Sequence, residues 1–160
     1  MTAMQANLVH RSAARGATGF TLIEVMIVVA IIAILAMIAY PSYVAYITKS
    51  NRKAAEACLS TFANYMERYY TTNLRYDQDT AATPVANALP TASTDCATTQ
   101  QTGSNYSYSF VSGSPTASAY TIQATPLNVQ LTRDTLCGTL TLNQAGTRTS
   151  SGSGQLSQCW

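Results

Sequence analysis

The first clear feature of the chain is an apolar run close to its N-terminus. Between Glu24 and Lys49 lie 24 residues without a single charge. As a helix that rises ~1.5 Å per residue, this run would be about 36 Å long, which exceeds the ~30 Å hydrocarbon core of a bilayer. The run therefore predicts a helix that crosses a membrane.

Past the apolar run, the pattern becomes that of an amphipathic helix. Apolar side chains recur at three- or four-residue steps, with one double step, at Val44, Ile47, Ala54, Cys58, Phe62, Met66 and Tyr69. The opposite side carries Lys49, Arg52, Lys53, Glu56, Asn64 and Arg68. One continuous helix is expected from about residue 21 to 70. Because Pro41 lacks an N–H, the hydrogen bond to the Met37 carbonyl is lost, and we expect the helix to bend there.

After a connection over residues 71–104, apolar and polar residues alternate. The alternating sets are Tyr106, Tyr108 and Phe110; Tyr120, Ile122 and Ala124; Leu127, Val129 and Leu131; and Leu136, Leu140 and Leu142. Period-2 alternation between turn-like breaks predicts short strands. Three or four antiparallel strands laid on the helix make an α+β head, followed by a Gly/Ser-rich tail that ends in Cys159 and Trp160.

The composition is poor in charge. Charged residues make up 10% of the chain and the formal net charge is +2, whereas soluble globular proteins carry roughly 25% charged residues. When Arg11 and Arg15 are left out, the chain contains seven basic and seven acidic residues. An uncharged polar surface behind an apolar segment favours an exported protein and does not favour a polyanion binder.

The four cysteines, Cys58, Cys96, Cys137 and Cys159, all follow the apolar run. They form no CxxC pair and the only histidine is His10, so no metal site or cofactor is expected. An even number of cysteines beyond an apolar segment favours two disulfides in an oxidising compartment. The alternative is four buried free thiols.

The order of segments at the N-terminus differs from that of a secretory signal, in which the cleavage site follows the apolar stretch. Here Arg11 and Arg15 come first, then small residues up to Gly19, and only then the apolar run. A cut after Gly19 would remove the basic leader, keep the apolar segment and make Phe20 the new N-terminus.

These residues resemble the class III signal of type IV prepilins and the related pseudopilins. The match comprises GFTLIE from Gly19 to Glu24, the following VMIVVAIIAILA, and Pro41-Ser42-Tyr43. The resemblance implies that a prepilin peptidase cuts between Gly19 and Phe20 and methylates Phe20. The chain departs from the pattern at Ala33, where many relatives carry glycine. The ending CGTLTLNQAG…CW looks like that of minor pilins of the PilE type.

Glu24 has two interpretations. With Thr21 it fits a capping box at the helix start, which the helix dipole also favours by ~0.3–1 kcal/mol. However, the apolar residues before it draw the carboxylate below the interface, where ionisation costs at least ~2.5 kcal/mol. The resemblance implies a partner, because in that family this glutamate meets the N-terminal ammonium of a neighbouring subunit in the filament.

The resemblance also implies the domain plan and the setting of the chain. Residues 1–19 form a cleaved leader, 20–48 the membrane and filament half of the helix, and 49–160 the head. The head comprises helix 49–70, connection 71–104, and sheet and tail 105–160. The expected location is the inner membrane with a periplasmic head, then the extracellular pilus. The expected partners are prepilin peptidase, other pilins and the inner-membrane assembly machinery.

Four cysteines allow three pairings, and the sequence alone does not choose between them. We expect Cys58–Cys96, since Cys58 on the apolar helix face can anchor the long connection. We expect Cys137–Cys159, since these residues open the last strong strand and end the tail.

Catalytic patterns are missing from the sequence. The mature chain would contain no histidine, and its acidic residues are scattered. The expected function is a structural subunit of a type IV pilus that supports pilus biogenesis, twitching motility, adhesion or DNA uptake. Two alternatives remain open: a type II secretion pseudopilin, and a competence pilin that binds DNA through Arg68, Arg75, Arg133 and Arg148 if these converge in space.

Overall fold

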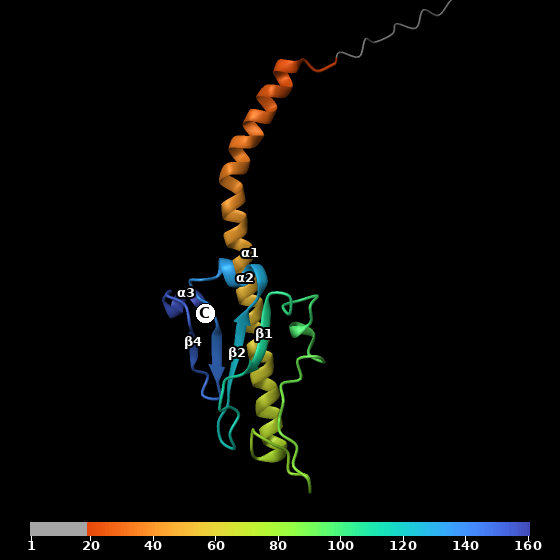
Figure 1. Ribbon diagram of the computed structural model, residues 1–160, viewed down its shortest axis with the longest axis vertical. Coiled ribbons are helices and arrows are strands. Elements are labelled where there is room, and N and C mark those ends of the chain that lie inside the picture. The colour runs from red at the N-terminus through yellow and green to blue at the C-terminus, as the bar shows by residue number, and fades with distance from the viewer. Residues whose placement is uncertain (1–18) are drawn as a thin grey trace, which may run out of the picture. The chain divides into compact units, whose positions relative to one another are not determined.

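The computed structural model describes residues 19–160, so residues 1–18 of the predicted leader, with His10, Arg11 and Arg15, lie outside the described residues. The described chain falls into two units, one ending at Ala39 and one from Tyr40 to Trp160. Its elements (Figure 1) are α1 (Leu22–Asn73), the 3-10 helix η1 (Asp95–Ala97), β1 (Tyr106–Phe110), β2 (Thr121–Pro126), α2 (Asn128–Arg133), β3 (Leu140–Asn143), β4 (Arg148–Ser150) and α3 (Leu156–Cys159).

The first unit is the N-terminal part of α1. Its large apolar side chains, from Leu22 to Ile38, are each at least 50% exposed. An 18-residue window of α1 reaches a mean hydropathy of 3.0, and the helix is long and apolar enough to cross a membrane. The bend expected at Pro41 lies next to the boundary between the two units and stays a prediction.

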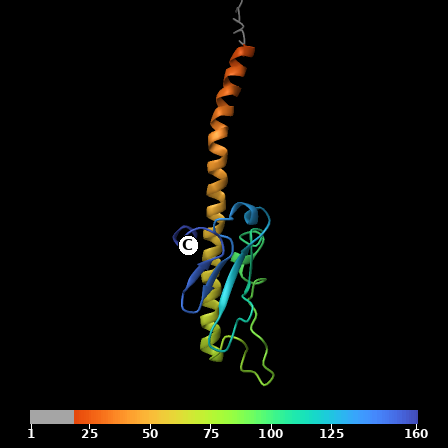
Figure 2. The ribbon, with the colours of Figure 1, turned by 60° about the vertical axis from the view of Figure 1, so that its left-hand side comes forward.

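The second unit has one core, built between the C-terminal part of α1 and the sheet (Figures 1 and 2). On α1 the fully buried apolar residues are Ala55, Cys58, Leu59, Phe62 and Met66. The predicted apolar face is confirmed at Cys58, Phe62 and Met66. It is wrong at Ala54, which is exposed beside the buried Ala55. The polar side is wrong at Arg52, which is buried.

The four strands form one antiparallel sheet in the order β1-β2-β3-β4. Tyr108 lies opposite Ala124, which in turn lies opposite Leu140. The buried sheet residues alternate with polar ones, as expected for a sheet with one face on a core. They are Tyr106, Tyr108, Ile122, Ala124, Pro126, Leu140 and Leu142. The predicted α+β class, a long helix packed on a small antiparallel sheet, is confirmed.

The segment from Leu127 to Leu131 corrects one prediction, because it forms α2 instead of a strand. The Leu131 N–H donates to the Leu127 carbonyl (3.2 Å), which closes a helical turn. Val129 and Leu131 are 54% and 56% exposed, while Gln130 between them is buried. The alternating apolar positions here mark the outside of the head. Leu136 is likewise exposed and lies outside β3.

The tail carries more structure than a Gly/Ser loop. Its residues Arg148–Ser150 form β4, which pairs with β3, and Leu156–Cys159 form α3. Gly152 passes so close to the chain at Leu136 that a Cβ would lie 2.2 Å from the Leu136 carbonyl oxygen. A larger residue would therefore push the tail away from the segment that leads into β3.

Two disulfides hold the irregular segments of the head. Cys58 of α1 is joined to Cys96 in the long connection, and Cys137 is joined to Cys159 in the tail. These are the pairs that the placement of the cysteines favoured. In the entropy model each closed loop stabilises the head by roughly 3–4 kcal/mol. The connection is also fixed by the buried Asn87, which donates to the Tyr76 carbonyl (2.8 Å).

Candidate functional site

The start of α1 shows how far helix capping accounts for Glu24. The Glu24 N–H donates to the Thr21 hydroxyl (3.3 Å), so Thr21 caps the helix. Among residues 19–160, however, no hydrogen bond or ion pair involves the Glu24 carboxylate, and Phe20 is 83% exposed. The half of the capping box that needs the Glu24 side chain is thus not formed, and this carboxylate is open to a partner.

A buried polar cluster fastens α2 and the following segment to α1. Arg52 of α1 forms an ion pair with Asp134, just past α2, and both side chains are at most 7% exposed. Tyr106 donates to the other oxygen of Asp134 (3.0 Å). Gln130 donates to the Thr48 carbonyl (3.0 Å). The members of the cluster come from α1, β1, α2 and the residue just past α2, so the cluster fixes how these elements pack.

The energetics of this cluster depend on its being complete. Removing one partner of a buried ion pair leaves an uncompensated charge and costs about 3–5 kcal/mol. Burial, with the nearby charge of Asp134, raises the pKa of Tyr106 well above its usual value, so the phenol stays protonated as a donor. Arg52 also donates to the Gln158 carbonyl (3.2 Å), which attaches α3 to the same point of α1.

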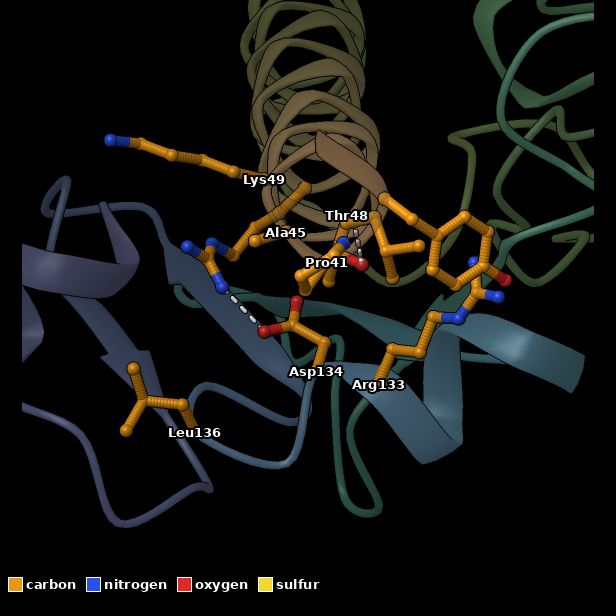
Figure 3. A pocket seen from close by; sticks show the side chains of 10 residues that line it. Pro41, Ala45, Thr48, Lys49, Arg133, Asp134 and Leu136 are labelled. Carbon is orange, nitrogen blue, oxygen red and sulfur yellow. Dashed lines mark hydrogen bonds and ion pairs between the residues drawn. The ribbon is translucent and has the colours of Figure 1, made fainter. Parts of the chain in front are cut away.

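A groove of about 500 Å³ opens beside this cluster (Figure 3). We call it the junction groove, and its lining residues are Tyr40, Pro41, Val44, Ala45, Thr48, Lys49, Arg52, Arg133, Asp134 and Leu136. In Figure 3, Lys49 and Arg133 extend on opposite sides of Pro41 and Thr48. Both cations are exposed, and neither forms an ion pair within the described chain.

The arginines that the sequence offered as a DNA-binding group are not gathered in this groove. Of Arg68, Arg75, Arg133 and Arg148, it contains only Arg133. Arg75 pairs with Asp77 (2.6 Å). Lys53 pairs with Glu56 (2.9 Å), so the basic cluster at residues 49–53 leaves only Lys49 unpaired in the described structure.

The outer sheet face is the second candidate surface. One row of polar side chains crosses all four strands, with Ser109 opposite Gln123, Gln123 opposite Thr141, and Thr141 opposite Thr149. Gln123 donates to the Ser109 hydroxyl (3.0 Å), and the hydroxyls of Thr141 and Thr149 lie 2.5 Å apart. This row presents hydroxyl and amide groups to solvent.

The edge strand β4, where the row ends, also carries a cation and an aromatic ring on the face of the sheet opposite the row, because Arg148 is paired with the buried Leu142. The Arg148 guanidinium lies over the Trp160 ring, 5.0 Å from its centroid. The Trp160 indole N–H donates to the Thr149 carbonyl (3.0 Å), which holds the ring against β4. Arg148 is exposed and forms no ion pair among residues 19–160, so its charge is available to an anion.

Sequence reasoning did not find Asp134, Gln130 or the row on the sheet. Gln130 lies at a polar position within the predicted strand from Leu127 to Leu131, Asp134 follows this run, and Arg52 lies on the predicted polar side of the helix. A signal for part of the row did exist, since Ser109, Gln123 and Thr141 alternate with apolar residues in predicted strands, whereas Thr149 lies in the predicted tail. Within the described residues, no group of His, Cys, Asp and Glu is arranged to hold a metal ion.

The chain matches two known protein families. Residues 14–40 match the prokaryotic N-terminal methylation motif. Residues 41–141 match a family described as "Type IV minor pilin ComP, DNA uptake sequence receptor". No curated protein matches the chain.

Among solved structures, a type IV pilin from Shewanella oneidensis is 25% identical, with a TM-score of 0.44 over 71% of this chain and 97% of the other. The ComP match extends over more than half of the chain and includes the C-terminal part of α1, β1, β2, α2 and the start of β3. The chain therefore belongs to the ComP family of type IV minor pilins.

Proposed function

We propose that this minor pilin binds DNA on its outer sheet face and contributes to DNA uptake as a subunit of a type IV pilus. The observation that carries the proposal is the match of residues 41–141 to a family described as a DNA uptake sequence receptor. These residues supply β1, β2 and part of β3, and with them most of the polar row on the sheet.

The first half of the proposal concerns assembly. We propose that prepilin peptidase removes residues 1–19 and methylates Phe20, and that residues 20–48 hold the chain in the inner membrane with its head in the periplasm. Glu24 then pairs with the N-terminal ammonium of a neighbouring pilin. The match of residues 14–40 to the methylation motif and the open Glu24 carboxylate support this.

Mass spectrometry of the mature chain tests the processing step. A methylated N-terminal Phe20 is expected. An intact leader would leave no ammonium at Phe20, and a cut after Ala39 would remove Glu24 and most of the apolar segment, so either result would contradict the pilin mechanism.

The second half concerns the DNA. Hydroxyl and amide side chains contact phosphate and sugar in many complexes, and arginine supplies the charge. The row of Ser109, Gln123, Thr141 and Thr149 offers such groups on one surface. Arg148 belongs to the edge strand β4 and is paired with the buried Leu142, on the other face of the sheet, so we propose that DNA on the row reaches its exposed guanidinium around this edge. Trp160 adds an aromatic ring, which suits stacking on a base.

The charge of the head limits how DNA can be bound. Residues 40–160 contain seven basic and six acidic side chains, and three of the basic ones, Arg52, Lys53 and Arg75, are ion-paired. Each phosphate contact contributes about −0.9 to the slope of log K against log salt concentration. A site that uses Arg148 alone should therefore give a slope near −1, far shallower than that of a basic DNA-binding domain.

The test is a salt titration of duplex DNA binding to the full mature chain in nanodiscs of neutral lipid. Arg148→Gln should weaken binding and bring the slope close to 0. Arg68→Gln is the matched control, because it removes the same charge from an exposed helix position. Equal effects of both variants, or no binding by the wild type, would contradict the outer sheet face as the DNA site.

The near balance of charge on the head supports a second candidate function. In this case the head acts only by contact with other pilins, which polar side chains at a wet interface would serve. The two functions are separable, since a purely structural subunit would show no specific DNA binding in the titration.

A further inference from the structure

We infer that the junction groove binds the phosphate headgroup of an anionic phospholipid while the chain is held in the membrane. The inference rests on the membrane anchoring proposed above but not on DNA binding. The occupant is identified by the position of the groove along the chain, by its mixed polarity and by the charges at its rim.

The position of the groove follows from helix length. A hydrocarbon core of ~30 Å corresponds to about 20 residues of helix, so a span that starts at Val25 reaches its far side near residue 44. The groove residues of α1, from Tyr40 to Arg52, lie on both sides of this point. Lipid headgroups are therefore the molecules that this stretch of helix meets first outside the hydrocarbon core.

The lining of the groove changes from apolar to cationic in the same direction. Pro41, Val44 and Ala45 come first along α1, and Lys49 follows one turn later. Arg133 adds a second exposed cation from the end of α2. An apolar wall next to two cations suits a lipid, since its acyl chains and its phosphate need these two environments together.

The remaining charged groups of the groove leave the positive charge at its rim uncancelled. Asp134 is the one acidic residue in the lining, and its two oxygens accept hydrogen bonds from Arg52 and Tyr106. Arg52 is buried, and its Nε is without a hydrogen-bond partner in the described structure. Lys49 and Arg133 therefore carry the charge that is free to attract an anion.

The end of the head beside the groove also exposes apolar side chains. Its exposed residues Val129, Leu131, Leu136 and Leu156 are 46–56% accessible. Gln130 of α2 bonds to the Thr48 carbonyl, and Gln158 of α3 accepts a bond from Arg52, so α2 and α3 flank the same turns of α1. Apolar side chains around a cationic groove suit contact with the bilayer interface.

Native mass spectrometry of the full mature chain, released from nanodiscs with equal amounts of phosphatidylglycerol and phosphatidylcholine, tests the inference. The wild type should retain phosphatidylglycerol preferentially. A Lys or Arg near an anionic surface contributes about 1 kcal/mol, so K49Q and R133Q should each lower the preference about fivefold and the double variant about 30-fold.

The matched control is the double variant K53Q/R68Q, which removes one lysine and one arginine from exposed helix positions outside the groove. It should keep the wild-type preference. The side chains of Lys49 and Arg133 make no hydrogen bond or ion pair within the described residues, so their replacement should leave the fold, the disulfides and the circular dichroism spectrum unchanged. An equal loss of preference in the control would overturn the inference.

Two further results would assign the groove to another occupant and overturn the inference. One is saturable binding of free glycerol phosphate, which has no acyl chain, by the protein in neutral discs. The other is an unchanged lipid preference in K49Q/R133Q together with lost DNA binding or lost entry into pili. A chain that fails to insert into discs at all would instead contradict the proposed anchoring.

Discussion

Leu35 and Leu59 lie on the same helix, yet they have opposite surroundings. Leu35 is 61% exposed and Leu59 is fully buried. The apolar residues of α1 up to Ile38 have no partner within the described chain, while those from Ala55 to Met66 pack against the sheet. The difference teaches that the apolar side chains in the first part of α1 suit contact with lipid or with other pilins, whereas those in the head are buried by contacts within the head.

The largest expected effect comes from the buried ion pair that joins the helix to the rest of the head. Asp134→Ala leaves Arg52 buried without its partner, so the free energy of unfolding of the head should fall by about 3–5 kcal/mol. Denaturant unfolding followed by the fluorescence of Trp160, the single tryptophan, measures this change.

The control for that variant is Asp77→Ala, which breaks the partly exposed pair with Arg75. Exposed ion pairs contribute little because solvent screens them, so a much smaller change is expected. If the two variants were equally stable, the buried cluster would not be what fastens α2 to α1.

A pair of identical substitutions tests the comparison directly. Leu59→Ala opens a cavity in the core and should destabilise the head by about 2–5 kcal/mol. Leu35→Ala removes the same atoms from an exposed position and should change head stability by less than about 0.5 kcal/mol. Thermal or denaturant unfolding of the full chain in detergent checks both, and a large effect of Leu35→Ala would show that the head depends on the first unit.

The parts of the fold and of the candidate site that the sequence predicts are those in which neighbours in sequence are also neighbours in space. The membrane segment and the core positions Cys58, Phe62 and Met66 follow from local periodicity, which a single helix obeys. The burial of Arg52 does not, because its partner Asp134 lies 82 residues away. The strand predicted from Val129 and Leu131 is wrong for the same reason. These two residues are exposed, and Gln130 between them is buried by hydrogen bonds to Thr48 and Tyr106, which are distant in the sequence.

The proposed role of the first unit in pilus assembly can be tested by replacing Glu24. Glu24→Val should leave the protein in the membrane but lower its incorporation into sheared pili by nearly two orders of magnitude, since a neighbour's unpaired ammonium costs at least ~2.5 kcal/mol in an apolar setting. Immunoblots of the pilus and membrane fractions measure both pools. Incorporation at the wild-type level would mean that Glu24 serves only the capping of the helix and does not pair with a neighbouring subunit.

The smallest expected effect is a pH dependence of the head at high pH. Burial raises the pKa of Tyr108 to about 12, while an unfolded tyrosine titrates near ~10. Stability from this phenol is thus complete below about pH 10 and is lost as the pH rises toward 12. Tyr108→Phe should reduce the loss of stability between pH 10 and 12, as measured by unfolding curves at each pH. The remaining loss should come from Tyr106 and Tyr120, because burial raises their pKa values as well.

If the first part of α1 serves assembly and the head serves a ligand, filament formation and DNA uptake should be separable. The most direct measurement counts pili and DNA uptake side by side in cells whose only copy of this chain carries Arg148→Gln. The proposed function predicts pili in normal number, with this subunit present in them, and strongly reduced uptake. Normal uptake, or a loss of pili in proportion to the loss of uptake, would contradict a DNA-binding role for the head.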